Sequence, residues 1–200
     1  MHPLQSNVNE EIEIKYLVHP IKFHQYLRSF IDKNVAPADA VLNLNQAYIA
    51  QSRGNTVRVR EVKTESYEEF VLCIKRSGVG INEVETFVSK EFAMPFFDGT
   101  FNTTSVSKRR FCYEIETSKG NFVVEVDAFK GLLSGLMYAE VEVSSHDIKI
   151  PLGELPDFLI EKSNKNKDLF MSNHKLSLLS EKESRDLSYR FIQQFQSGED

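Results

Sequence analysis

Polar and apolar residues alternate along several short segments of the chain. From Glu11 to Val18 the sequence reads Glu-Ile-Glu-Ile-Lys-Tyr-Leu-Val. Successive side chains of a β-strand point to opposite faces, so this order predicts one row of Glu11, Glu13 and Lys15 and a second, apolar row. A half-buried antiparallel strand with one solvated face shows the same pattern. The segment therefore has to be compared with the rest of the chain.

The alternation continues through the middle of the chain, and helical patterns flank it. Residues 46–142 consist of short segments rich in Val, Ile, Phe and Tyr between polar or glycine-containing turns. They predict a mostly antiparallel β region. Residues 20–34 begin with proline and carry one apolar stripe, as expected of a helix. Shorter helical segments are predicted at residues 95–100, within the β region, and at residues 152–162.

A last helix is predicted from Ser180 to residue 197. Ser180 and Glu183 have the spacing of a capping box, and Leu187, Phe191 and Phe195 recur every four residues. This helix should dock by one face. The sequence thus indicates a domain over residues 1–178 followed by a C-terminal docking helix over residues 179–200.

Charged residues follow the same two-residue spacing in at least seven segments, acidic in some and basic in others. The acids are Glu11, Glu13, Glu83, Glu85, Glu125, Asp127, Glu140 and Glu142, and the bases are Lys15, Arg58, Arg60, Lys75, Lys108 and Arg110. An exposed sheet face would more often intersperse Thr, Gln and Ser and set opposite charges across from each other. The rows favour a sheet that closes into a barrel, with the charged face inside and the apolar face outside under helices.

A charged interior of this kind needs a ligand, because burying an unpaired ion costs on the order of several kcal/mol. A polyphosphate would satisfy the bases, since Arg makes bidentate contacts with phosphate and Lys supplies a mobile point charge. Carboxylates repel phosphate unless a hard cation such as Mg²⁺ or Mn²⁺ lies between them. The residues therefore predict a small polyphosphate ligand and a divalent metal.

Composition narrows the class of protein. The chain has 200 residues, a net charge of −5 and a pI near 5.6. Binding a phosphate backbone requires a basic face, so no nucleic-acid partner is expected. No run of about 18 apolar residues and no basic N-terminal segment with an apolar core is present, so we expect a cytoplasmic protein without a membrane partner. Cys73 and Cys112 form no Cys-x-x-Cys pair and should pack as small apolar groups.

The ordered set of charged residues resembles the CYTH superfamily, also called triphosphate tunnel metalloenzymes. The resemblance covers roughly residues 9–178 and starts with Glu11-x-Glu13-x-Lys15. The later motifs are Arg58-x-Arg60, Lys75, Lys108-x-Arg110, Glu125-x-Asp127 and Glu140-x-Glu142. The resemblance implies an α+β fold in which a closed eight-stranded antiparallel β-barrel forms a tunnel with helices outside. It also implies metal-dependent hydrolysis or rearrangement of a triphosphate.

The resemblance implies roles for individual residues. Those expected to bind phosphate are Lys15, Arg58, Arg60, Lys75, Lys108 and Arg110, and those expected to hold metal are Glu11, Glu13, Glu140 and Glu142, with Glu125 and Asp127 as ligands or as their partners. Lys15, Glu13 and Tyr48 would also act in catalysis. Gln46-Ala47-Tyr48 resembles the family's Gln-x-Tyr, which puts Tyr48 near the tunnel; a packed strand aromatic is the alternative.

The middle acidic strand departs from the family pattern. Ile81 or Asn82 stands where an Arg usually precedes the Glu-x-Glu pair. The sequence therefore leaves open which of Glu83, Glu85 and Glu91 belong to the acidic lining.

The leading hypothesis is an enzyme that hydrolyses inorganic tripolyphosphate, as a monomer or homodimer. A class IV-type adenylate cyclase that converts ATP to cyclic AMP, a thiamine triphosphatase and a non-catalytic module that binds polyphosphate or a nucleotide are the alternatives. The carboxylates Glu11, Glu13, Glu140 and Glu142 favour an enzyme, because a binding module has no need for all of them.

Overall fold

The computed structural model describes residues 12–31, 38, 40–52, 55–76, 82–143, 145, 147–163 and 166–196. Contacts between residues group them into two units. Within the described residues, unit 1 contains residues 42–107 and 173–178, and unit 2 contains residues 12–41, 108–172 and 179–196. Glu11 lies outside the described residues.

The sheet of unit 1 has one charged and one apolar face. Its strands are β2 (Ala40–Ser52), β3 (Asn55–Lys63), β4 (Glu68–Arg76), β5 (Asn82–Val88) and the first residues of β6 (Thr104–Thr117), in the order β5-β4-β3-β2-β6. The pairs β2–β3, β3–β4 and β4–β5 are antiparallel. On the apolar face, Val59 and Phe70 pack with Ala93 of the helix α2 (Lys90–Ala93).

Short helices complete unit 1. The single turn η1 (Met94–Phe96) directly follows α2, and α3 (Asn173–Ser177) lies further along the chain. Helix α2 begins after Ser89, whose Oγ accepts a hydrogen bond from the amide of Phe92. The helical segment predicted at residues 95–100 is therefore present only in part. It begins earlier because Ser89 caps it, and it ends at Phe96, so that residues 97–100 are not helical.

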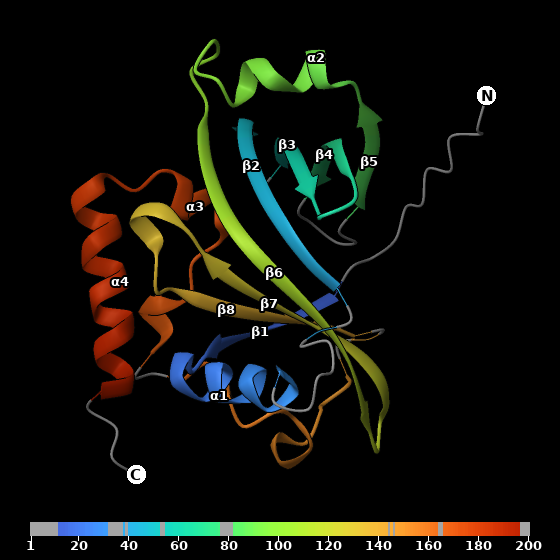
Figure 1. Ribbon diagram of the computed structural model, residues 1–200, viewed down its shortest axis with the longest axis vertical. Coiled ribbons are helices and arrows are strands. Elements are labelled where there is room, and N and C mark those ends of the chain that lie inside the picture. The colour runs from blue at the N-terminus through green and yellow to red at the C-terminus, as the bar shows by residue number, and fades with distance from the viewer. Residues whose placement is uncertain are drawn as a thin grey trace. The chain divides into compact units, whose positions relative to one another are not determined.

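The sheet of unit 2 repeats this two-faced design. Its strands are the rest of β6, β7 (Gly120–Phe129), β8 (Met137–Val143), β1 (Ile12–Val18) and β9 (Leu159–Ile160), in the order β6-β7-β8-β1-β9. Helix α1 (Pro20–Ile31) covers the apolar face (Figure 1). Its Phe23 is 1% exposed and makes edge-on contacts with the rings of Phe111 and Phe158, at 5.4 and 5.1 Å between centroids.

The C-terminal helix α4 (Glu181–Gln196) belongs to unit 2 and packs by one face, as predicted. Leu187 and Phe191 are buried, and the ring of Phe191 contacts that of Tyr138 edge-on. The predicted capping box is present, because Ser180 donates its amide to Glu183 at 2.9 Å and accepts the amide of Glu183 at 3.4 Å. Three single turns complete this unit: η2 (Gly131–Leu133), η3 (Leu152–Glu154) and η4 (Lys167–Leu169).

The helix predicted at residues 152–162 is wrong. Only η3 is helical there, and β9 pairs with Leu17 and Val18 of β1. Pro156 accounts for the difference, because proline lacks an amide proton and clashes with the preceding helical turn.

The closed eight-stranded barrel is not confirmed. The described residues form nine strands, and their hydrogen-bonded order starts at β5 and ends at β9 without returning to its beginning. The coarser expectation of an α+β protein with a large antiparallel β region is confirmed. Among the described residues, no helix combines the length and apolar composition that crossing a bilayer requires.

Candidate functional site

The register of unit 2 places its charged residues on one sheet face. Residues opposite each other in an antiparallel pair share a face. The opposed pairs are Glu13 with Glu142, Lys15 with Glu140, Glu125 with Glu140, and Arg110 with Asp127. With Lys108, these residues form what we call the unit 2 charged face. The intervening residues, such as Val126 and Val141, are fully buried on the opposite, apolar face.

Arg110 lies at the centre of the unit 2 charged face and contacts three carboxylates. Its Nε is 2.7 Å from Asp127 Oδ1 and its Nη2 is 2.8 Å from Asp127 Oδ2. Nη1 donates to Glu125, and Nη2 also lies 3.2 Å from Glu140 Oε2. Burial alone would lower the pKa of Arg110, but Asp127, Glu125 and Glu140 hold it well above its ordinary value. The guanidinium therefore stays charged.

Lys108 and Asp127 form a buried ion pair beside Arg110. Lys108 is fully buried and Asp127 is 3% exposed. Burial, followed by the neighbouring charge of Arg110, lowers the pKa of Lys108. Burial would raise the pKa of Asp127, but Arg110 and Lys108 hold it below its usual range.

Glu125 and Glu140 face each other across β7 and β8 but have opposite pKa shifts. Burial would raise the pKa of Glu140, yet Lys15, Lys108 and Arg110 hold it far below its usual range. Lys15 donates a hydrogen bond of 2.5 Å to Glu140 and also lies 3.7 Å from Glu13. For Glu125, burial raises the pKa, and although Arg110 opposes the shift, the charges of Asp127 and Glu140 add to it.

The unit 1 charged face consists of Arg58, Arg60, Cys73, Lys75, Glu83 and Glu85. Here too, each base is paired with a carboxylate: Arg58 with Glu83 at 3.0 Å, Arg60 with Glu85 at 2.7 Å, and Lys75 with Glu83 at 3.3 Å. Burial would lower the pKa of Arg58, but Cys73 and Glu83 hold it above its ordinary value. The Nε atoms of Arg58 and Arg60 are buried and make no hydrogen bond within the described residues. Both guanidinium groups thus keep a donor for an additional acceptor.

Cys73 is a member of this face that sequence reasoning missed. It lies opposite both Arg58 and Glu85, and its Sγ is 3.1 Å from Glu85 Oε1. Burial raises the pKa of the thiol to about 11, so Cys73 is neutral at physiological pH. The signal was its position two residues before Lys75, which gives both side chains the same face.

The residues whose roles the sequence left open lie in different surroundings; they are Tyr48, Glu83, Glu85 and Glu91. Tyr48 is buried opposite Arg58, with its hydroxyl 3.4 Å from Gln46 Oε1 and its ring 5.1 Å from that of His174. It is thus a packed strand aromatic beside a member of the unit 1 charged face. Glu83 and Glu85 lie on β5, whereas Glu91 is exposed on α2.

The carboxylates of unit 2 fit a hard divalent cation by their chemistry. Glu13 opposes Glu142 and Glu125 opposes Glu140, and like charges directly across a strand pair are unfavourable without a counter-ion. Carboxylate oxygens are the donors that Mg²⁺ and Mn²⁺ prefer. Within the described chain, the group with three ligand atoms inside 4.8 Å of one another is Cys73, Glu83 and Glu85, which the bases of unit 1 already engage.

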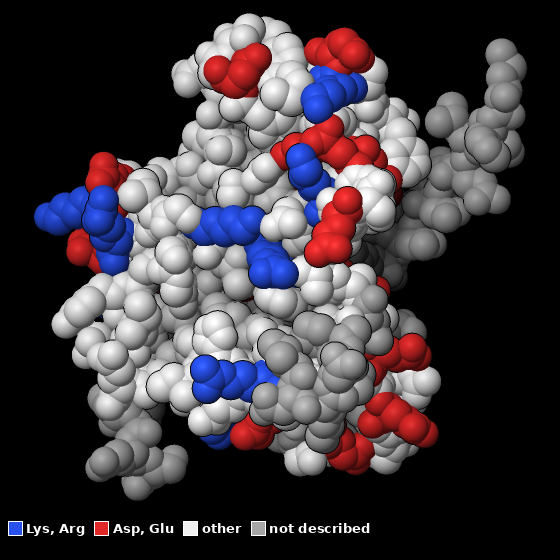
Figure 2. Space-filling view, in the orientation of Figure 1, with Lys and Arg blue, Asp and Glu red and all other residues white. Residues whose placement is uncertain are grey.

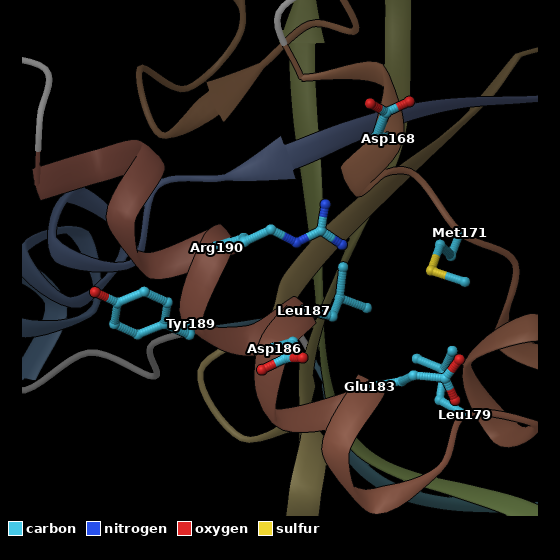
Figure 3. A pocket seen from close by; sticks show the side chains of 8 residues that line it. All are labelled: Asp168, Met171, Leu179, Glu183, Asp186, Leu187, Tyr189 and Arg190. Carbon is cyan, nitrogen blue, oxygen red and sulfur yellow. The ribbon is translucent and has the colours of Figure 1, made fainter.

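Opposite charges also adjoin each other on the molecular surface. Figure 2 shows Lys and Arg side chains next to Asp and Glu on the visible face. A separate hollow of about 560 Å³ lies beside α4 in unit 2. Its walls include Asp168, Glu183, Asp186 and Arg190 together with apolar side chains (Figure 3). None of the residues that line it belongs to the unit 2 charged face.

Solved structures share the fold. No protein-family model and no curated protein matches this chain. A crystal structure of the inorganic triphosphatase NE1496 is 24% identical, with a TM-score of 0.50, over 85% of this chain and 95% of that one. A Bacillus halodurans protein provisionally described as an adenylate cyclase is 19% identical, with a TM-score of 0.54, over 80% of this chain and 97% of that one. These likenesses show that the chain shares the fold of both proteins, as the resemblance seen in the sequence leads one to expect.

Proposed function

We propose that this chain, which has the fold of CYTH-type proteins, hydrolyses a triphosphate with the help of Mg²⁺ or Mn²⁺, and that inorganic tripolyphosphate is the substrate. The observation that carries the proposal is the unit 2 charged face, where Lys15 and Arg110 lie among carboxylates on neighbouring strands. The neighbour named as an inorganic triphosphatase supports this choice of reaction. The closed tunnel of the family is part of the proposal.

In this proposal, basic side chains bind the phosphate groups of the substrate. Arg58, Arg60 and Arg110 suit bidentate contacts with phosphate oxygens, and Lys15 and Lys75 add point charges. Ion pairs with carboxylates hold these side chains on the charged faces, and phosphate oxygens would take the place of those carboxylates when substrate binds. Lys15 orients the terminal phosphate and stabilises the charge on its oxygens.

The carboxylates hold the metal in this proposal. Glu13, Glu140 and Glu142 would supply the oxygen ligands, with Glu11 from outside the described residues. A bound divalent ion would neutralise phosphate charge and activate a water molecule. Lys15 and Arg110, which now contact Glu140, would then be available to phosphate oxygens.

The test measures orthophosphate release from tripolyphosphate, ATP and thiamine triphosphate, with Mg²⁺, with Mn²⁺ and with EDTA. Glu13→Gln and Lys15→Ala are expected to reduce metal-dependent release from tripolyphosphate at least about a hundredfold, since each removes a group that acts on transition-state charge. Lys22→Ala is the matched control, because Lys22 pairs only with the exposed Asp157 in the described residues. Equal activity in all four proteins would refute the proposal.

Adenylate cyclase activity is the second candidate. The Bacillus halodurans neighbour favours it, because cyclisation of ATP uses the same phosphate and metal groups. Cyclic AMP and pyrophosphate formed from ATP, in place of orthophosphate, would select this reaction.

A further inference from the structure

Asp127 connects two cations on the unit 2 charged face, the buried Lys108 and the partly exposed Arg110. Its Oδ1 accepts from Arg110 Nε, and its Oδ2 accepts from both Arg110 Nη2 and Lys108 Nζ. Its side chain is 4% exposed and that of Lys108 is 0% exposed. Both oxygens of Asp127 are therefore engaged, and neither residue is open to a ligand.

We propose that Lys108 and Asp127 are positioning residues that fix Arg110, and that they contact neither the metal nor the phosphate. This inference rests on the proposed function and deepens it. It replaces the phosphate contact that the sequence resemblance implies for Lys108. Of the two roles that the resemblance leaves open for Asp127, metal ligand or partner of the ligands, it excludes the first.

The two edges of the Arg110 guanidinium have different partners. The Nε–Nη2 edge makes a bidentate contact with Asp127, which Lys108 holds from its other side. The outer edge, through Nη1 and Nη2, contacts Glu125 and Glu140, whose side chains are 19% and 12% exposed. Phosphate oxygens can reach Arg110 only by replacing these two carboxylates. Asp127 fixes the direction in which that outer edge points.

Lys108 keeps Asp127 in its contact with Arg110, an arrangement that we call the Asp127 clamp. A single carboxylate between two cations is held by both, so Asp127 cannot turn toward a metal ion without leaving Lys108 buried and unpaired. The Lys108 ammonium also lies 6.0 Å from the centroid of the Phe129 ring, which limits where it can move. Glu140 also lies between two cations, Lys15 and Arg110, but its side chain is 12% exposed and that of Lys15 is 44% exposed. The side chain of Glu125 is 19% exposed. Both carboxylates are free to exchange partners while the Asp127 clamp stays in place.

The experiment separates metal affinity from phosphate affinity. Electron paramagnetic resonance of free Mn²⁺ gives the Mn²⁺ dissociation constant, and steady-state kinetics give KM and kcat for tripolyphosphate. For Asp127→Asn we expect KM to rise at least about tenfold while the Mn²⁺ dissociation constant stays within about twofold of wild type. Glu140→Gln is the comparison, with a rise of at least about tenfold in the Mn²⁺ dissociation constant.

Two further variants make the result specific. Because Asp127→Asn leaves Lys108 without its counter-ion, the double variant Lys108→Met with Asp127→Asn removes both buried charges and should give the same KM increase in a protein that melts cooperatively. In an Arg110→Ala background, Asp127→Asn should change KM by less than about twofold, because the residue it positions is gone.

Two outcomes would overturn the inference. Loss of Mn²⁺ affinity in Asp127→Asn equal to that in Glu140→Gln would make Asp127 a metal ligand, and a full effect of Asp127→Asn in the Arg110→Ala background would break the link to Arg110. Either result with an active wild type refutes this inference alone. A wild-type protein that neither binds nor cleaves tripolyphosphate refutes the proposed function as well.

Discussion

At the scale of single residues, carboxylates on one charged face differ in the direction of their pKa shifts because their neighbouring charges differ. Glu125 and Glu140 are the clearest example, since they lie opposite each other on neighbouring strands. Three bases hold the pKa of Glu140 down, whereas burial and nearby carboxylates raise that of Glu125. A lowered carboxyl pKa stabilises the fold above the unfolded pKa, and this contribution is lost as pH falls through the folded pKa. A raised carboxyl pKa, in contrast, lowers the stability of the fold at pH values above the unfolded pKa.

Glu140→Gln should therefore lower the free energy of unfolding at pH 7 by about 1–3 kcal/mol, because Lys15 and Arg110 lose a charged acceptor. The difference from wild type should shrink as pH falls below the unfolded value of 4.5. Urea titrations at pH 7 and in acid measure both effects. The matched variant Glu125→Gln should not lower stability at pH 7, and equal losses in the two variants would contradict the assignment.

The two cysteines should differ in reactivity. Cys73 is fully buried with a pKa of about 11, whereas Cys112 is partly exposed. A thiol-specific disulfide reagent at pH 8 should modify Cys112 in the native protein and Cys73 only after unfolding, because the thiolate is the reactive form. Mass spectrometry counts the modified thiols, with Cys112→Ser as the control. Rapid modification of that variant without unfolding would contradict the burial of Cys73.

At the scale of elements, local signals in the sequence predicted two helices correctly. A contact between residues distant in sequence explains the helix that was predicted wrongly. Helices α1 and α4 could be predicted because proline in the first turn and the Ser180–Glu183 capping box are local signals joined to an apolar stripe. The helix predicted over residues 152–162 is absent because Leu159 and Ile160 form a strand that pairs with β1, which is distant in sequence. Pro156 was the local sign against a helix.

Docking of α4 can be tested by comparing two aromatic residues on the same helix. Phe191 is fully buried against Tyr138 and Phe195, whereas Tyr189 is 64% exposed. Phe191→Ala should lower the free energy of unfolding by about 3–5 kcal/mol. Tyr189→Ala, with the same change in helix propensity, should alter it by no more than about 0.5 kcal/mol. Urea unfolding followed by circular dichroism measures both, and similar effects would show that the helix does not dock by this face.

At the scale of the whole molecule, the bases of both charged faces are paired before any ligand binds. Each described base on these two faces has a carboxylate partner. We therefore expect the fold to keep its stability without a metal ion. In this respect it differs from small metal-stabilised domains, which unfold when a chelator removes the ion.

Metal removal should leave the fold intact. EDTA should shift the Tm by less than about 1 °C, because the ion pairs remain. Mg²⁺ with tripolyphosphate at about a hundred times its Kd should add about 2.7 kcal/mol of stability, since ligand binds only the native state. Differential scanning calorimetry measures both. Unfolding by EDTA alone would show a structural metal.

Much of the charged set could be predicted from sequence, since two-residue spacing alone assigns side chains to a face of a strand. The spacing does not predict which acidic and basic side chains form ion pairs with each other. The saturation of Arg110 by Asp127, Glu125 and Glu140 depends on the register of three strands, and the position of Glu91 depends on where β5 ends and α2 begins. Cys73 was missed because a thiol in an apolar segment resembles ordinary packing.

The separation of charged and apolar side chains onto opposite faces has a consequence for evolution. Substitutions at the charged positions leave the contacts beneath α1 and α2 unchanged, because those contacts use the intervening residues. Reaction and substrate can diverge within a lineage while the packing is inherited intact. A laboratory library that varies only alternate positions of β1, β3 and β8 would keep this packing in every member, although each variant would lose the ion pairs of the positions that it changes.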